Sequence, residues 1–274
     1  MKNIAKEIRA LTIECIASIG QGHIGGSLSI VDALTVLYYK HMNIDPSNPK
    51  KEGRDRLVVS KGHAGPGVYA TLAHKGYFPK EELSTLNKIG TNLPSHCDMN
   101  KTPGVDMTAG SLGQGLSCAC GMALGSRLAK DGAYIYCIIG DGESQEGQIW
   151  EASMFAAHEK LDNLIVMLDY NKLQLCGYTD DVMSIHDPAK KWESFGFYVQ
   201  SIDGNNINAV DAAITNAKQN KGKPSMIVLN TIKGKGFSYS ENAGIDNHSM
   251  PISAEILQKA KEDFGIEVKY LEKI

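Results

Sequence analysis

The 274-residue chain has no apolar stretch long enough to cross a membrane. Its two longest apolar stretches, residues 134–140 and 164–170, are far shorter than the roughly 20 residues of a spanning helix. The N-terminal residues MKNIAKEIRA carry charges every few positions and no apolar centre, unlike a signal peptide. We therefore expect no membrane contact and a cytoplasmic location.

The sequence also lacks an excess of charge of one sign. Lysine and arginine number 28 against 31 acidic residues, so the formal net charge is −3. Nucleic acids and anionic membranes attract basic chains, so neither is an expected partner. No C-x-x-C pair occurs among the six cysteines, and a chain of this length buries enough core to fold without disulfides. We interpret the cysteines as reduced thiols.

Helical and extended patterns alternate along almost the whole chain. Short apolar strands are predicted at 56–60, 134–140, 164–170, 197–202 and 225–232. Helices are predicted at 4–19, 28–41, 68–75, 112–128, 148–159, 188–195, 209–219 and 254–264. Wholly apolar strands separated by helices are typical of a parallel sheet that is covered on both faces. We predict one α/β domain over residues 1–274, with a doubly wound, mostly parallel sheet and ligands at the carboxyl ends of its strands.

The sequence GQGHIG at 20–25 fits the pattern G-x-G-x-x-G. A dinucleotide-binding fingerprint must follow a strand and open a helix, with an acidic residue about 20 residues further on. This copy follows a helix and lacks that acidic residue. We interpret it as a glycine-rich loop that presents His23.

A second glycine-rich segment has the context that a phosphate site requires. Gly140-Asp141-Gly142 follows an apolar strand and precedes a helix, whose N-terminus favours an anion. A carboxylate beside a diphosphate indicates a hard divalent cation between the two. Asn171 comes about 30 residues later, one strand–helix–strand unit further on, and offers a neutral oxygen ligand. The pair predicts a metal-bridged diphosphate site.

G-D-G followed by this asparagine is the thiamine diphosphate motif, and the chain resembles the N-terminal domain of transketolase. The resemblance extends over nearly the whole chain, through GHIGGSLSI, DRLVVSKGHAGPGVYATL, LPSHCDMNKTPGVDMTAGSLGQG, GDGESQEGQIWEA and KPSMIVLNTIKGKG. Transketolases continue through two further domains, whereas this chain stops after the first. It therefore resembles the N-terminal subunit of a split transketolase.

The resemblance implies transfer of a two-carbon ketol unit from a ketose, or its phosphate, to an aldose. The cofactors would be thiamine diphosphate, as electron sink, and Mg²⁺ or Ca²⁺. In the family, the glutamate that activates the cofactor lies in the second domain. We therefore expect activity only with a C-terminal, pyrimidine-binding subunit, in a self-associating heterotetramer.

By the same resemblance, Asp141, Asn171 and the backbone carbonyl of Leu173 would hold the metal. Asn171 and Gly142 would also contact the diphosphate, and Gly110 and Leu112 would pack near the aminopyrimidine.

Glu146 would join a network that links paired active sites. It lies at the start of the helix that carries Trp150 and Phe155, which are candidates for the partner interface or for the core.

Four histidines are the catalytic candidates that the resemblance implies. His63 and His248 match residues near the diphosphate and the reacting carbon, and His23 and His96 match the substrate channel. Histidine titrates near neutral pH and can donate to a developing oxyanion, which suits proton movements at sugar hydroxyls. Short members of the family have an aromatic residue, His, Gly and Lys around His248. This chain departs from that pattern with Asp-Asn-His-Ser-Met at 246–250.

Two other functions would fit part of the pattern. The α subunit of a 2-oxoacid dehydrogenase also carries G-D-G, and a thiamine diphosphate-binding module without catalytic function would keep the fold. The histidine-bearing loops argue against the first, and the intact Asp141 and Asn171 argue against the second.

Overall fold

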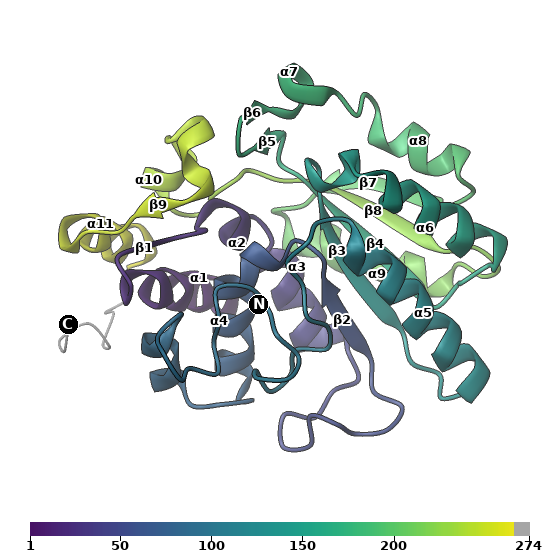
Figure 1. Ribbon diagram of the computed structural model, residues 1–274, viewed down its shortest axis with the longest axis horizontal. Helices are drawn as coiled ribbons and strands as arrows, with labels where there is room; N and C mark the ends of the chain where they lie inside the picture. The colour runs from purple at the N-terminus through teal and green to yellow at the C-terminus, as the bar shows by residue number, and fades with distance from the viewer. Residues whose placement is uncertain (266–274) are drawn as a thin grey trace.

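Five parallel strands form the centre of the molecule, in the order β2-β3-β4-β8-β7 (Figure 1). The computed structural model describes residues 1–265. The strands are β2 (Arg56–Val59), β3 (Ile135–Gly140), β4 (Leu164–Tyr170), β7 (Tyr198–Asp203) and β8 (Ser225–Asn230). The predicted doubly wound α/β fold with a parallel sheet is confirmed.

Helices cover both faces of this sheet, and the strand side chains alternate between two core clusters. In β3, Tyr136 and Ile138 belong to one cluster, whereas Cys137 and Ile139 belong to the other. The cluster on the first face also contains residues of α1 (Lys2–Ala17), α2 (Gly25–Ser29), α3 (Val31–Val36), α4 (Gly65–Lys75), α9 (Ile207–Gln219) and α11 (Ala254–Phe264), of which α11 packs on α1. The second face packs on α5 (Gln114–Ala129), α6 (Gly147–His158) and α8 (Pro188–Ser194). Because both faces are buried, the central strands β3, β4 and β8 are almost wholly apolar, whereas the edge strand β7 is partly exposed and contains polar residues.

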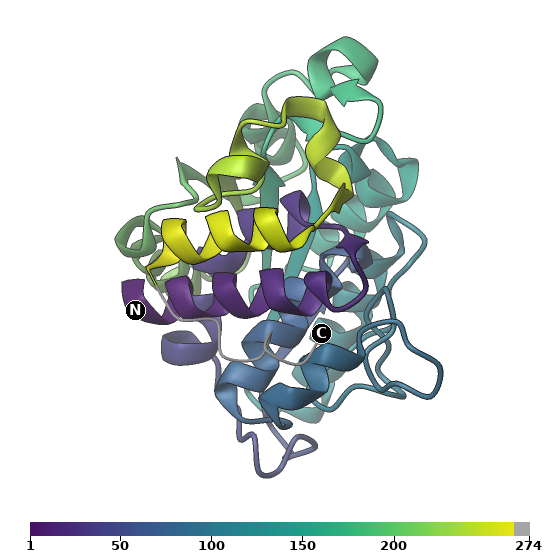
Figure 2. The same ribbon diagram turned by 90° about the vertical axis from the view of Figure 1, so that its left-hand side faces the viewer.

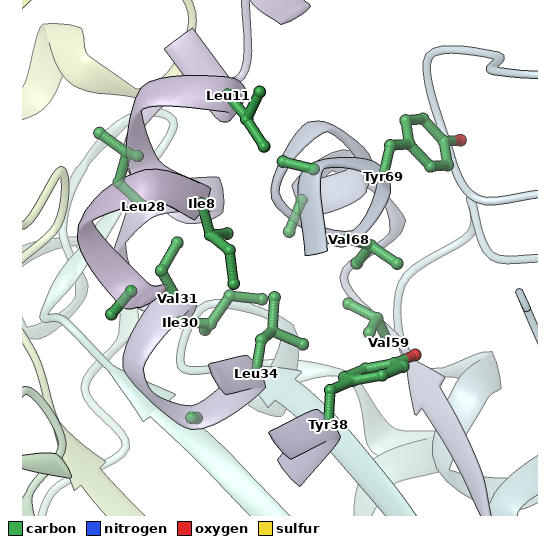
Figure 3. Packing of buried hydrophobic residues seen from close by; sticks show 14 of the residues in the cluster. Ile8, Leu11, Leu28, Ile30, Val31, Leu34, Tyr38, Val59, Val68 and Tyr69 are labelled. Carbon is green, nitrogen blue, oxygen red and sulfur yellow. The ribbon is translucent and has the colours of Figure 1, made fainter. Parts of the chain in front are cut away.

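The predicted helix at 28–41 is wrong in its bounds and its continuity. Helix α2 ends at Ser29, Ile30 leaves helical geometry, and α3 is followed by a π-helical turn at Leu37–His41. All residues from 24 to 38 are buried, so their apolar pattern has no period that could mark the break. Figure 3 shows Leu28 and Val31 packing into the core with α1 and α4.

Two short antiparallel ladders lie outside the main sheet, and the sequence predicted neither. Strand β1 (Gln21–Gly22) pairs with β9 (Met250–Pro251), and β5 (Leu173–Gln174) pairs with β6 (Gly177–Tyr178). The first ladder joins segments from near both ends of the chain. In the same region, α11 runs beside α1 (Figure 2).

The remaining short elements are helical turns. They are Gly62–Ala64, Lys80–Thr85, Glu143–Gln145, α7 (Thr179–Met183), α10 (Ser238–Glu241) and Gly244–His248. No helix in the part of the chain that is described is long and apolar enough to cross a bilayer.

The two aromatic residues of α6 have different surroundings. Trp150 is half-buried and packs against the second core cluster, where it stacks on Phe195 and contacts Trp192. Phe155 is 42% exposed. Of the two, Phe155 is the more accessible to a partner.

Candidate active site

A cavity of about 360 Å³ opens where β2, β3, β4 and β8 end. Its lining includes Lys61, Asp141, Asn171 and Lys233, each of which lies at most three residues beyond the end of one of these strands. All the site residues predicted from the sequence line this one cavity: His23, His63, His96, Gly110, Leu112, Asp141, Gly142, Glu146, Asn171, Leu173 and His248. The site lies at the sheet edge where open α/β folds bind ligands.

Four histidine rings meet on one side of the cavity. The ring centroid of His23 lies 5.5 Å from that of His63, 5.6 Å from that of His96 and 5.2 Å from that of His248. The rings of His63 and His248 are 5.1 Å apart. Despite the departure around position 248 noted above, His248 thus lies in the same cluster as the other three.

The ladder between β1 and β9 holds two of these histidines together. His23 directly follows β1 and His248 lies two residues before β9. The amide of Ile252 donates to the carbonyl of Gly20 over 2.8 Å and extends the pairing. Backbone hydrogen bonds therefore set the distance between two loops that are far apart in the sequence.

Asn247 fixes the turn that carries His248. Its buried side-chain amide donates to the carbonyls of Lys233 and Ser240, both over 3.2 Å. A Cβ at Gly25 would lie 2.5 Å from the Asn247 carbonyl oxygen. Glycine at position 25 therefore lets the loop of His23 approach the turn closely.

All four rings are held in the neutral state near pH 7. Burial is the largest cause in each case and lowers the pKa of His23, His63 and His96, and lowers that of His248 to about 4. The charge of Lys233 lowers the pKa of His248 further. A neutral imidazole has one donor and one acceptor nitrogen, so each ring can either donate a hydrogen bond to a hydroxyl group or accept one from it.

An oxygen-rich corner forms on the other side of the cavity. The Asp141 carboxylate accepts from the amides of Gly142 over 2.8 Å and Lys172 over 2.5 Å. The side-chain oxygen of Asn171 accepts from the amide of Leu173 over 3.1 Å. The turn after β4 is thereby bonded to the turn after β3, which brings the three predicted metal ligands to one place.

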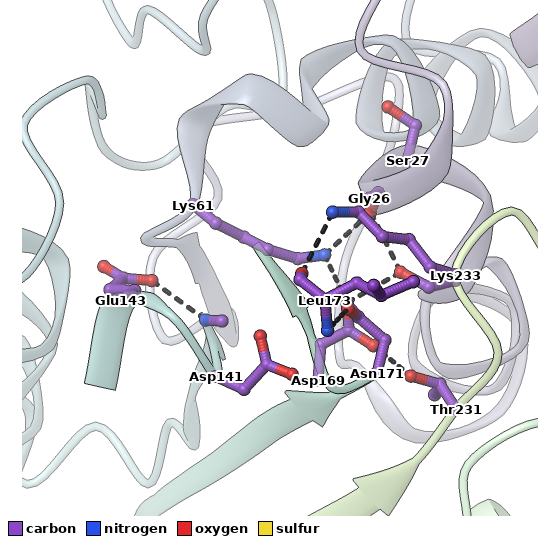
Figure 4. Close-up of polar contacts among 12 residues, drawn as sticks. Gly26, Ser27, Lys61, Asp141, Glu143, Asp169, Asn171, Leu173, Thr231 and Lys233 are labelled. Atoms are coloured by element: carbon purple, nitrogen blue, oxygen red, sulfur yellow. Dashed lines mark hydrogen bonds and ion pairs between the residues drawn. The ribbon is translucent and has the colours of Figure 1, made fainter. Parts of the chain in front are cut away.

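A buried ion pair lies beneath this corner (Figure 4). The ammonium of Lys61 and the carboxylate of Asp169 are 2.6 Å apart and both are buried. Asp169 also accepts from Ser29 over 2.6 Å, from the amide nitrogen of Asn171 over 2.8 Å and from Thr231 over 2.5 Å. Because Asn171 donates its nitrogen to Asp169, its oxygen is directed away from that carboxylate.

The chemistry of the corner fits a cation and an anionic ligand. Burial, followed by the charge of Asp169, raises the pKa of Asp141 to about 7, and a cation beside this carboxylate would favour its charged form. The ammonium of Lys233 already donates to the Leu173 carbonyl over 3.0 Å, so a positive charge can reach that oxygen. Burial lowers the pKa of Lys233 to about 8, and a diphosphate would favour its charged form.

A cation here would depend on mixed donors. Within residues 1–265, no three His, Cys, Asp or Glu side chains are arranged to hold a metal. The available set is one carboxylate, one amide oxygen and one backbone carbonyl. Oxygen donors of this kind suit Mg²⁺ or Ca²⁺.

The rim of the cavity carries the remaining predicted residues. A Cβ at Gly142 would lie 3.0 Å from the Gln174 side chain, so glycine keeps this turn narrow. Gly110 and Glu146 are exposed, and Leu112 is 37% exposed. This open edge is where a further molecule could complete the cavity.

Sequence reasoning missed two lysines and a glutamate in the lining. Lys61 and Lys233 stand in the glycine-rich segments SKGH and KGKG just beyond strand ends, and that context signals an anion site. Glu143 lies inside the turn after β3, and nothing in the sequence singles it out.

Comparison with known proteins assigns the family. Residues 1–272 match the family described as "Transketolase, thiamine diphosphate binding domain". The chain is 55% identical over 260 residues to the 6-deoxy-6-sulfo-D-fructose transketolase subunit SqwG of Clostridium sp. (strain MSTE9), and this match covers 95% of this chain and 94% of that protein. It is 36% identical over 265 residues to an apulose-4-phosphate transketolase subunit of Phocaeicola vulgatus, a match that covers 97% of this chain and 94% of that protein.

A solved transketolase structure is similar to this chain over almost its whole length. A transketolase variant from Pichia stipitis matches with a TM-score of 0.91 and 31% identity, covering 98% of this chain and 41% of that chain. The chain therefore belongs to the transketolase family, and residues 1–272 are its thiamine diphosphate binding domain.

Proposed function

We propose that residues 1–274 form one domain that acts as the N-terminal subunit of a two-subunit transketolase. It would transfer a two-carbon ketol unit from a ketose to an aldose, together with a C-terminal subunit. The observation that supports this most directly is the single cavity that carries the histidine cluster on one side and the Asp141 corner on the other. The family match argues against the 2-oxoacid dehydrogenase alternative.

Asp141, Asn171 and the Leu173 carbonyl would hold Mg²⁺ or Ca²⁺ against the diphosphate, and the Gly142 backbone would face it. When bound, thiamine diphosphate supplies the nucleophilic carbon and the electron sink. Lys61 and Lys233 bring positive charge to the same end of the cavity. A diphosphate would therefore be oriented with its charge away from the open rim.

The histidine cluster would handle the protons of the sugar. Besides burial, the charge of Lys61 lowers the pKa of His63 and His248, and that of Lys233 lowers the pKa of His23 and His248. His96 contacts His23 and extends the cluster. Neutral imidazoles can donate to a hydroxyl oxygen or accept its proton without first losing a proton themselves. The half-buried setting keeps this proton exchange away from bulk water.

We propose a ketose with an anionic terminal group as donor, with 6-deoxy-6-sulfo-D-fructose tested first. The support is the name of the relative that is 55% identical over 95% of this chain. No arginine is among the described residues that line the cavity. The anionic end of the sugar would then be bound by the partner subunit.

A partner would cover the open rim. Leu175 lines the cavity and is 66% exposed, and Tyr178 and Met183 nearby are exposed as well. Exposed apolar side chains next to a ligand cavity mark an interaction surface. We propose that the C-terminal subunit binds here and that the chain also self-associates, giving a heterotetramer in the cytoplasm, where the free cysteines stay reduced.

Mixing the two subunits tests the proposed function. We expect no ketol transfer by this chain alone and full turnover after addition of the C-terminal subunit. The assay uses the two subunits separately and then together, with 6-deoxy-6-sulfo-D-fructose and D-fructose 6-phosphate as donors. Turnover by the isolated chain would contradict the split enzyme, and persistent inactivity of the mixture would favour the non-catalytic binding module.

Replacing His23 or His96 with alanine should lower kcat/KM for the donor about tenfold or more, the effect of one lost hydrogen bond to the substrate. The affinity for thiamine diphosphate should stay within about twofold, because the Asp141 corner is untouched. Steady-state kinetics and calorimetric titration measure the two quantities. His158→Ala, at the exposed end of α6, is the control. An equal loss of cofactor affinity would place these rings at the cofactor instead.

A further inference from the structure

The Glu143 carboxylate is a buried hub between three loops of the cavity. One carboxylate oxygen accepts from the amide of Gly113 over 2.8 Å and from the Ser60 hydroxyl in a short hydrogen bond. The other accepts from the amide of Gly140 over 3.0 Å. The side chain is 3% exposed, so these bonds are shielded from water.

Each bonded segment continues into a different part of the cavity lining. Ser60 directly precedes Lys61, at the end of β2. Gly140 directly precedes Asp141, at the end of β3. Gly113 directly follows Leu112, on the rim. In each of three loops, Glu143 is therefore hydrogen-bonded to the residue directly next to one that lines the cavity.

Ser60 extends the hub to the start of α5. Its hydroxyl oxygen accepts from the Gly115 amide over 3.1 Å while its proton is donated to Glu143. A Cβ at Gly115 would lie 2.4 Å from that hydroxyl oxygen. Glycine at position 115 therefore permits this close contact, and the first turn of α5 is bonded to the hub at two amides.

The arrangement requires an acceptor at both oxygens of residue 143. Two donors converge on one oxygen and a third on the other. A glutamine would keep the shape but turn an NH₂ group toward at least one of these donors. An unsatisfied buried donor costs about 1–3 kcal/mol, so the loops would separate or shift.

We infer that Glu143 is a positioning residue that sets the distance between the Asp141 turn and the Gly110–Leu112 loop. This inference rests on the proposed function, in which the Asp141 turn faces the diphosphate, and on the family resemblance, by which Gly110 and Leu112 would pack near the aminopyrimidine. The affinity for a ligand that reaches both segments depends on the distance between them. The affinity for a ligand that contacts only the Asp141 corner does not depend on that distance.

Two ligands of different length provide the test. The full-length chain with Glu143→Gln should bind Mg²⁺–thiamine diphosphate about tenfold more weakly than wild type, the loss expected for one charged hydrogen bond. Its affinity for Mg²⁺ with inorganic diphosphate should change less than about threefold. Calorimetric titration with each ligand measures both losses of affinity, which are then compared. Thermal unfolding shows what fraction of the variant is folded at the titration temperature. Glu193→Gln, exposed on α8, removes the same charge and should change neither affinity.

A second variant keeps the test valid if Glu143→Gln does not fold. Ser60→Ala removes the hydroxyl that bridges Glu143 and Gly115, and should weaken thiamine diphosphate binding in the same selective way. In the double variant the two losses should be less than additive, because both act through one network. Equal losses for both ligands, or unchanged affinities in a folded variant, would overturn the inference. Ketol transfer is not measured, so failure of the proposed function would be recognised separately in the mixing assay.

Discussion

Asp141→Ala is expected to lower the affinity for Mg²⁺–thiamine diphosphate by about a hundredfold or more. Loss of an outer hydrogen-bond partner already costs about 10- to 100-fold in metal affinity, and this change removes a ligand. Without the bridging cation, the diphosphate would meet only the two lysines and the backbone. Calorimetric titration with Mg²⁺ and thiamine diphosphate measures the loss.

The same variant should still fold without ligand, although less stably. The Asp141 carboxylate accepts from the amides of Gly142 and Lys172, and removing this buried acceptor should lower the free energy of unfolding by about 1–3 kcal/mol. Thermal unfolding of the variant without ligand measures this loss and separates it from lost binding. Asp181→Ala, exposed on α7, is the matched control and should bind as wild type. Unchanged affinity in Asp141→Ala would remove Asp141 from the site.

Asp169→Asn should destabilise the fold by about 3–5 kcal/mol, the usual effect of breaking a buried ion pair. Lys61 would remain buried without a counter-charge, and Ser29 and Thr231 would lose a charged acceptor. Chemical denaturation of the wild type and the variant measures the difference. Asp211→Asn breaks a more exposed pair with Lys40 and should cost less than about 1 kcal/mol. A loss no larger than that of Asp211→Asn would contradict the prediction.

The ion pair between Lys61 and Asp169 also makes the stability of the folded state depend on pH, and the direction of the change can be predicted. Burial raises the pKa of Asp169, but Lys61 and the hydrogen bonds outweigh it, so the pKa is lower in the folded protein than its usual value. The folded state therefore gains stability above the unfolded pKa of about 3.9 and loses it as pH falls through the folded value. In Asp169→Asn, this part of the acid sensitivity should disappear.

The sheet could be predicted because its strands are buried on both faces. Residues 134–140 and 164–170 contain almost no polar residues, and this pattern alone indicates a covered parallel sheet. The same uniform burial hid the break at Ile30, since a helix that is buried all round shows no period. Uniform burial therefore makes the strands easy to predict from the sequence and makes the helix boundary at Ile30 hard to predict.

The site could be predicted where a residue type and a strand end coincide, as at Asp141 and Asn171. The contribution of Glu143 depends instead on contacts between distant loops, namely the hydrogen bonds that it accepts from Ser60 and Gly113. His248 lies in a segment that departs from the family pattern, yet backbone pairing and Asn247 bring it to the cluster. Tertiary contacts of this kind leave no local trace in the sequence.

The ladder between β1 and β9 has a consequence for synthesis on the ribosome. Neighbouring strands such as β3 and β4 are joined by one helix and can pair soon after they emerge. The contact between His23 and His248 instead waits until residues 248–252 have been made, after every strand of the main sheet. Contacts between such distant segments form late because a long loop must close first. A nascent chain therefore makes all the strands of its sheet before it can close its histidine cluster, and the cofactor meets a complete cavity only after that step.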